Sequence, residues 1–116
     1  MHDSYIEISR QGEALGRALA LVREQREPLK AFFAAPDYDE VVFVACGSSY
    51  WSSLSACMTL QEQLHVPCSA VKSGDIVLNR AHYEQRYSKP LVIAPSRSGQ
   101  TSETLIALEM FRQRYH

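Results

Sequence analysis

The sequence has few cysteines, no long apolar run and almost no excess of charge of either sign. No apolar stretch approaches the roughly 20 residues that cross a membrane, so we expect no membrane partner. Twelve Lys and Arg stand against thirteen Asp and Glu, a net charge of −1 that is dispersed along the chain. Nucleic acid requires a basic surface, so no nucleic-acid partner is expected either. The three cysteines, an odd number without an N-terminal export signal, predict reduced thiols in a cytoplasmic protein.

The sequence also lacks the patterns of metal and nucleotide sites. His65 and Cys68 lie three residues apart, but no second ligand pair accompanies them, so we expect no metal ion. No G-x-G-x-x-G run follows a predicted strand. In addition, Lys72 closes the second predicted strand, where a nucleotide-binding domain carries an acidic residue. No cofactor is therefore expected, and a nucleotide- or flavin-binding domain stays an alternative.

The chain contains the alternation of helices and apolar strands that is typical of an α/β protein. Val41–Ala45 is a continuous apolar run, which suits a parallel strand covered on both faces. Together the pattern predicts a parallel sheet with right-handed crossovers and Val41–Ala45 at its centre. The expected helices are 4–26, a short one from Pro28 to Phe33, 50–64, a short helix and loop within 76–88, and one from Ser102. The other expected strands are Cys68–Lys72 and Leu91–Pro95.

The helical periodicity predicts which side chains face inward. In the first helix Ile8, Leu15, Leu19 and Val22 form one apolar stripe. In the last helix Leu105, Leu108 and Phe111 are expected to face the core. With 116 residues, of which 46% are apolar, the chain suits one domain at most. We expect a helical segment at 1–40 and the sheet-forming region at 41–116.

Two serine-rich loops each follow a predicted strand and open a helix. The first is Gly47-Ser48-Ser49, and the second runs from Ser96 to Thr101. In an open α/β sheet, ligands bind outside the carboxyl ends of the strands. The first amides of a helix lack intrahelical partners and, with the helix dipole, favour an anion. Hydroxyls before helices are often only caps, so residue types and spacing alone leave capping and anion binding both open.

The residues of both loops resemble the phosphosugar loops of the sugar isomerase (SIS) domain. Ala45-Cys46-Gly47-Ser48-Ser49-Tyr50 is similar to the first loop of that family. The run from Ser96 to Thr104 is similar to the second, Ser-x-Ser-Gly-(Glu)-Thr-x-(Asp or Glu)-Thr, with Gln100 where Glu is commonest. The match is closest to the branch that holds the isomerase part of glucosamine-6-phosphate synthase, with phosphosugar isomerases and fructosamine deglycases among its relatives.

The resemblance implies a flavodoxin-like three-layer fold and a set of phosphate contacts. A complete SIS domain has five parallel strands, and this sequence shows three, so we expect the N-terminal part of a longer protein. Asp75 stands where the branch has Glu, and its role stays open. Contacts to the phosphate are implied for Ser49, Ser96, Ser98 and Thr101, lining positions for Ser48 and Arg97, and close backbone approach at Gly47 and Gly99.

The implied ligand is a sugar phosphate of the fructose 6-phosphate, amino-sugar or fructosamine phosphate class. The catalytic residues of the branch lie in a later, second SIS domain, so no catalytic residue is expected in this chain. The parent protein would be an isomerase, a deglycase or an aminotransferase. A phosphosugar-sensing regulator without catalysis stays an alternative. The open edge of a three-stranded sheet also predicts a homodimer or aggregation.

Overall fold

The computed structural model describes residues 3–34 and 37–115, in two compact units. The first unit is Met1–Pro36 and the second is Asp37–His116. The division falls within the segment 1–40 that the sequence marked as helical. The assignment of 41–116 to the N-terminal part of a SIS domain stays a prediction.

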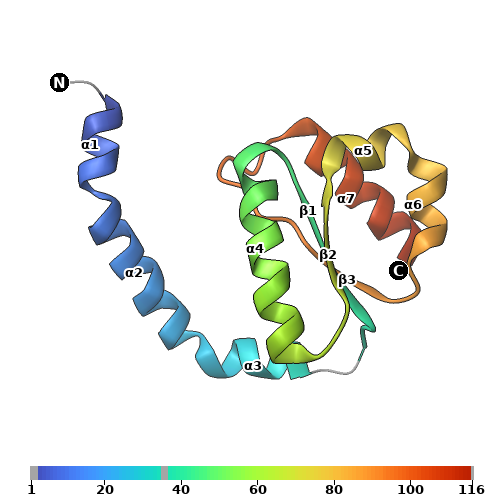
Figure 1. Ribbon diagram of the computed structural model, residues 1–116, viewed down its shortest axis with the longest axis horizontal. Coiled ribbons are helices and arrows are strands. Elements are labelled where there is room, and N and C mark those ends of the chain that lie inside the picture. The colour runs from blue at the N-terminus through green and yellow to red at the C-terminus, as the bar shows by residue number, and fades with distance from the viewer. Residues whose placement is uncertain (1–2, 35–36, 116) are drawn as a thin grey trace. The chain divides into compact units, whose positions relative to one another are not determined.

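The first unit consists of three helices, α1 (Asp3–Ser9), α2 (Gln11–Glu24) and α3 (Arg26–Ala34) (Figure 1). The prediction of one helix over 4–26 was wrong at Arg10, which separates α1 from α2. The break is slight, because Arg10 keeps right-handed helical angles and its carbonyl accepts the amide of Ala14 at 3.0 Å. The predicted stripe of Ile8, Leu15, Leu19 and Val22 is exposed.

The second unit is built on a three-stranded parallel sheet with β1 at its centre. The strands are β1 (Glu40–Ala45), β2 (Cys68–Lys72) and β3 (Pro90–Ile93), in the order β2-β1-β3. The register pairs Val41 with both Cys68 and Leu91. The helices are α4 (Gly47–Leu64), α5 (Ser73–Leu78), α6 (Arg80–Arg86) and α7 (Ser102–Tyr115). The predicted parallel sheet and its central strand are confirmed.

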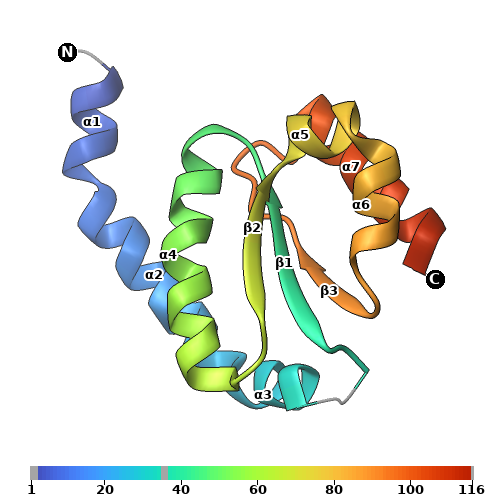
Figure 2. The same ribbon diagram turned by 45° about the vertical axis from the view of Figure 1, so that its right-hand side comes forward.

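Helices cover the two faces of this sheet and give it three layers. Helix α4 lies on one face, and α5, α6 and α7 lie on the other (Figures 1 and 2). Because successive side chains of a strand point to opposite faces, β1 serves both layers. Val41 and Phe43 pack with Cys57 of α4, whereas Val42 and Val44 belong to the opposite cluster.

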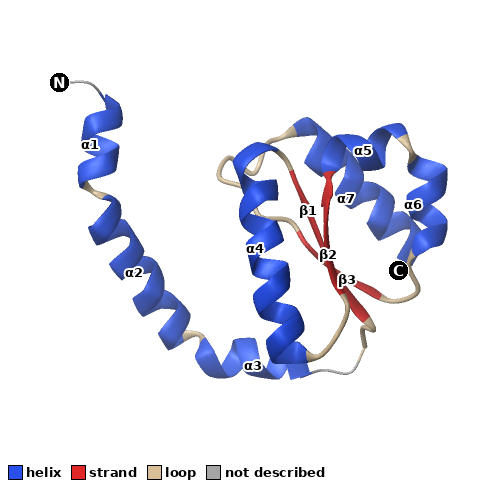
Figure 3. Ribbon diagram, viewed as in Figure 1, coloured by secondary structure: helices blue, strands red, loops and turns tan. Residues whose placement is uncertain are grey.

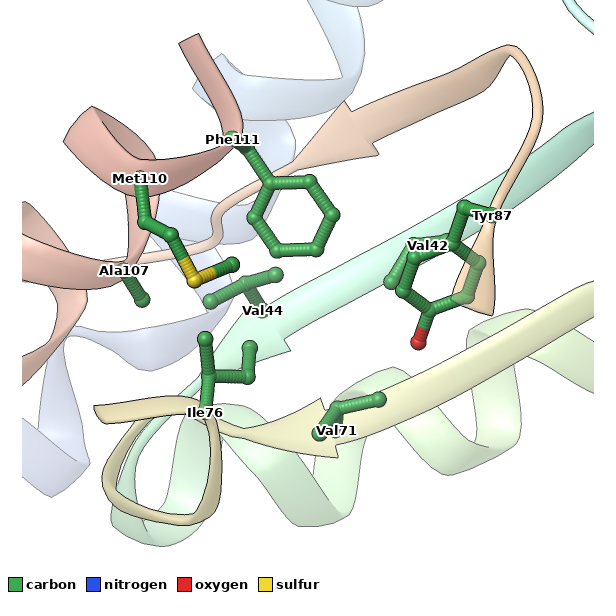
Figure 4. Packing of buried hydrophobic residues seen from close by; sticks show 8 residues of the cluster. All are labelled: Val42, Val44, Val71, Ile76, Tyr87, Ala107, Met110 and Phe111. Atoms are coloured by element: carbon green, nitrogen blue, oxygen red, sulfur yellow. The ribbon is translucent and has the colours of Figure 1, made fainter. Parts of the chain in front are cut away.

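The larger core cluster lies between β1 and α7. Its members come from β1, β2, α5 and α7, together with Tyr87, which directly follows α6. Figure 4 shows these side chains gathered around Val44 and Phe111. The burial of α7 corrects one prediction. Phe111 is only 3% exposed, as expected, but Leu105 is 51% exposed, because α7 turns Thr104, Ala107 and Met110 inward instead.

Figure 3 shows the helices and strands by colour, and several of their boundaries differ from the sequence prediction. Helix α4 begins at Gly47 and not at Tyr50, so Ser48 and Ser49 lie in its first turn. Ser73 begins α5 where a turn was expected, and β3 ends at Ile93, two residues early. Among the described residues, no helix is both long enough and apolar enough to cross a bilayer.

Candidate functional site

The strand order places a topological switch point at the carboxyl ends of β1 and β3. The chain leaves β1 through α4 to reach β2 on one side, and it then returns through α5 and α6 to β3 on the other side. Helices α4 and α7 therefore start on opposite faces of the sheet, next to each other. Such a topological switch point is where open α/β sheets bind their ligands. Both serine-rich segments lie here: Figures 1 and 2 show the loop before α7 beside the start of α4.

The first segment is the opening turn of α4. Cys46 is its N-cap residue and makes no side-chain capping bond. The first amide that finds a helical partner is that of Tyr50, which donates to the Cys46 carbonyl at 3.4 Å. The amides of Gly47, Ser48 and Ser49 thus precede the helical ladder and point out of the helix end. Within the described part of the chain, the hydroxyls of Ser48 and Ser49 make no hydrogen bond, so both can donate to an anion.

The second segment is folded by its own hydroxyls. The Ser96 hydroxyl oxygen accepts the amide of Gly99 at 2.9 Å, and the Ser98 oxygen accepts the amide of Gln100 at 3.2 Å. Gly99 has φ of +66°, a left-handed conformation that glycine adopts without strain. A hydroxyl that accepts an amide still holds its own proton. Ser96 and Ser98 therefore shape the loop and keep one donor each for a ligand.

The remaining predicted site residues also lie at this end of the sheet. Gly47 has φ of +53° at the start of α4, which suits a glycine at the turn out of β1. Arg97 is exposed, and Thr101 is half-buried directly before α7. Neither side chain makes a hydrogen bond or ion pair with the described residues. The structure thus brings the two predicted segments to one edge, while contact of any of these residues with phosphate stays a prediction.

A cluster of two buried hydroxyls and one half-buried thiol joins the elements around this end of the sheet. The Thr104 hydroxyl lies 2.9 Å from the Ser73 hydroxyl and donates to the Cys46 sulfur at 3.6 Å. Ser73 is fully buried and Thr104 is 5% exposed. Cys46 follows β1 as the N-cap residue of α4, Ser73 follows β2, and Thr104 lies in the first turn of α7. Thr104 thus connects the starts of α4, α5 and α7 by hydrogen bonds. The sequence motif includes Thr104, but nothing in the sequence indicated this role.

Replacing Thr104 with Val should destabilise the chain by about 1–3 kcal/mol, because the buried Ser73 hydroxyl would lose its partner. Valine matches threonine in shape, so the change removes the hydrogen bonds with little change in volume. Urea denaturation followed by circular dichroism measures the loss. Thr104→Ser keeps the hydroxyl and should retain more of the stability than Thr104→Val. A Val variant as stable as the wild-type chain would show that the cluster contributes nothing.

The three cysteines are free thiols in the structure. Burial, together with the neighbouring Cys57 thiol, raises the pKa of Cys68 from 9.0 to about 12. Cys68 therefore stays protonated and is a poor nucleophile or metal ligand at neutral pH. Among the described residues, no three His, Cys, Asp or Glu side chains gather as metal ligands would.

The fold and its switch point define an α/β domain of the kind that binds small ligands at the strand ends. No family model matches the chain. Glutamine–fructose-6-phosphate aminotransferase (isomerizing) of Chlamydia caviae is 34% identical over 114 residues, 93% of this chain and 18% of that protein. The protein of the same name from Chlamydia abortus is 37% identical over 82 residues, 71% of this chain and 13% of that protein. This chain thus spans less than a fifth of the length of these relatives.

Solved structures share the fold. Tagatose-6-phosphate ketose/aldose isomerase of Escherichia coli superposes with a TM-score of 0.78 and 26% identity, over 93% of this chain and 30% of that one. A structure from Clostridium novyi gives a TM-score of 0.80 and 27% identity, over 92% and 28% of the two chains. The chain belongs to the SIS-domain family, to which the resemblance of its two loops pointed.

Proposed function

We propose that this chain binds the phosphate of a sugar phosphate at the switch point between β1 and β3. The observation that carries the proposal is that two segments rich in hydrogen-bond donors lie side by side at the carboxyl ends of the strands. The start of α4 offers amides and hydroxyls without partners, and the Ser96–Thr101 loop holds the hydroxyls of Ser96 and Ser98 ready to donate. Amide and hydroxyl donors at a helix start suit an anion, and the macrodipole adds to their attraction.

The relatives support a proposal for the sugar class and the reaction. Their names specify fructose 6-phosphate and tagatose 6-phosphate, so we propose a six-carbon ketose phosphate or its amino-sugar counterpart as the ligand. In this proposal the chain is the ligand-binding part of an isomerase, a deglycase or an aminotransferase. We assign no catalytic residue to it. The three free thiols support a place in the cytoplasm.

Calorimetry with the 116-residue chain tests the proposal, with fructose 6-phosphate and fructose as the two probes. We expect binding of fructose 6-phosphate and none of fructose at the same concentrations, because the phosphate supplies the charge that the amides and hydroxyls bind. Equal binding of both sugars, or binding of neither, would contradict the proposal.

We also propose that the chain forms a homodimer along the outer edge of β3. No described strand pairs with that edge, and a groove of about 740 Å³ runs beside it. The groove is lined by apolar groups of Leu91, Val92, Leu108, Phe111 and Tyr115, together with polar residues. An open strand edge beside an apolar groove is a ready pairing surface.

Sedimentation at tens of micromolar, roughly the range in which unpaired edges associate, should show a dimer or larger species. Val92→Lys would place a charge in this groove and should shift the chain toward the monomer. A wild-type chain that sediments only as a monomer would rule the dimer out.

A further inference from the structure

A cavity lies at the carboxyl ends of the strands, next to the two proposed phosphate segments. It is lined by three charged side chains that the phosphate proposal does not use. Its volume is about 290 Å³. Lys72 ends β2, Asp75 lies in α5, and Glu103 lies in the first turn of α7. The side chains of these three residues make no ion pair or hydrogen bond with another described residue. Tyr50 and Trp51, in α4, form an aromatic wall of the same cavity.

The position of Lys72 is set by this aromatic wall. Its ammonium nitrogen lies 5.3 Å from the centre of the Tyr50 ring and 5.9 Å from that of Trp51. Both distances fall within the range of a cation–π contact. The register of the sheet explains the contact, because Lys72 pairs with Ala45, and α4 begins two residues after Ala45. The ammonium is thus held at the cavity while its protons remain available.

The charges of the cavity exclude a second phosphate site. One ammonium and two carboxylates give the lining a net charge of −1, which disfavours an anion. The same groups suit the uncharged part of a sugar. Carboxylates accept hydrogen bonds from hydroxyls, an ammonium donates to hydroxyl or carbonyl oxygens, and an aromatic ring packs against C–H groups. Trp51 is 64% exposed, which leaves its ring open to such packing.

The cavity also adjoins both proposed phosphate segments. Gly47 lines it and directly precedes Ser48, and Glu103 lines it two residues after Thr101. A ligand whose phosphate lies at these segments would extend its carbon chain into the cavity. Its volume is at the small end of the range of roughly 300–1,000 Å³ that ligand pockets show, which fits a small ligand.

We propose that this cavity is the subsite for the hydroxyl-bearing carbon chain of the phosphosugar, with Lys72 and Asp75 as its specificity-determining contacts. The inference rests on the proposed phosphate site. It goes further, because it assigns the sugar part of the ligand to residues that neither phosphate segment contains.

The test compares inorganic phosphate with fructose 6-phosphate by calorimetry on the 116-residue chain. The measured quantity is the preference, defined as the dissociation constant of inorganic phosphate divided by that of fructose 6-phosphate. Lys72→Met should lower the preference by about tenfold, the effect of losing one hydrogen bond to a charged group. Asp75→Asn should also lower it, while inorganic phosphate binds as tightly or tighter, because a negative charge has been removed. General damage to the site would weaken both ligands together.

Lys89→Met is the matched control, because it removes the same positive charge as Lys72→Met. Lys89 directly precedes β3, at the opposite end of the sheet from the cavity. Its preference should equal that of the wild-type chain. Trp51 is the only tryptophan, so its fluorescence gives a second readout. Fructose 6-phosphate should change the Trp51 emission, and inorganic phosphate should not.

The outcomes separate the two proposals. If neither ligand binds the wild-type chain, the phosphate site falls and this subsite falls with it. If both bind but the preference is unchanged in Lys72→Met and Asp75→Asn, the phosphate site stands and the subsite is overturned. A wild-type chain without any preference overturns the subsite in the same way.

Discussion

The Phe111→Ala variant should lose about 3–5 kcal/mol of stability, the cost of deleting a buried phenylalanine. Phe111 is 3% exposed, and its ring centre lies 5.7 Å from those of both Tyr87 and Tyr115. It is the α7 side chain on which the larger core cluster converges (Figure 4). Small domains are stable by only about 5–15 kcal/mol in total, so this single change should remove a large part of the stability of the folded chain. Urea denaturation followed by circular dichroism measures the difference.

Leu105→Ala on the same helix is the matched control. Leu105 is 51% exposed, so its truncation should cost no more than about 0.5 kcal/mol. If Phe111→Ala yields no soluble protein, Phe111→Leu supplies a milder variant of the same kind. Equal losses for the two alanine variants would mean that α7 does not pack with the described face toward the sheet.

Replacing Ser98 with Ala should weaken the binding of fructose 6-phosphate by about ten- to a hundredfold. The hydroxyl proton of Ser98 remains free while its oxygen accepts the amide of Gln100. A hydrogen bond to a charged group contributes about 1.5–3 kcal/mol, and about 1.4 kcal/mol corresponds to a factor of ten. The fold should survive, because Ser98 is exposed and lies outside the core. Calorimetry of the two chains measures the change.

Two further variants separate phosphate contact from a purely structural role. Ser55→Ala removes an exposed hydroxyl from the middle of α4 and should leave the affinity unchanged. Ser98→Thr keeps a hydroxyl and should recover part of the lost affinity. If wild-type and Ser98→Ala chains bind the phosphorylated sugar equally, the Ser98 hydroxyl only folds the loop around Gln100.

Two of the three strands were predictable almost to the residue, whereas β3 spans Pro90–Ile93 where Leu91–Pro95 was expected. Val41–Ala45 became β1 with one added residue, and Cys68–Lys72 became β2 unchanged. The start of α4 was missed because Gly47, Ser48 and Ser49 are common helix breakers. At a helix start the same residues are favourable, since a first turn needs no intrahelical amide bonds.

The inward face of α7 was less readable from the sequence. The buried positions include Thr104 and Ala107, a polar and a small residue, whereas the larger Leu105 faces outward. The apolar pattern was therefore right at Phe111 and wrong at Leu105. The cavity lined by Lys72, Tyr50 and Trp51 could not be predicted from the sequence for another reason. The parallel register of β1 and β2 brings these residues together, and this register cannot be read from their spacing along the chain.

The central position of β1 has a consequence during synthesis on the ribosome. β1 is the most buried strand and is translated before its partners, which begin at Cys68 and Pro90. At roughly 5–20 residues per second, the nascent chain presents β1 with both backbone edges unpaired for seconds. Helix α4 is the next element to emerge and can shelter Val41 and Phe43 during this interval. Substitutions that weaken the packing of α4 should therefore lower the yield of folded chain in cells by more than their effect on the free energy of unfolding would predict.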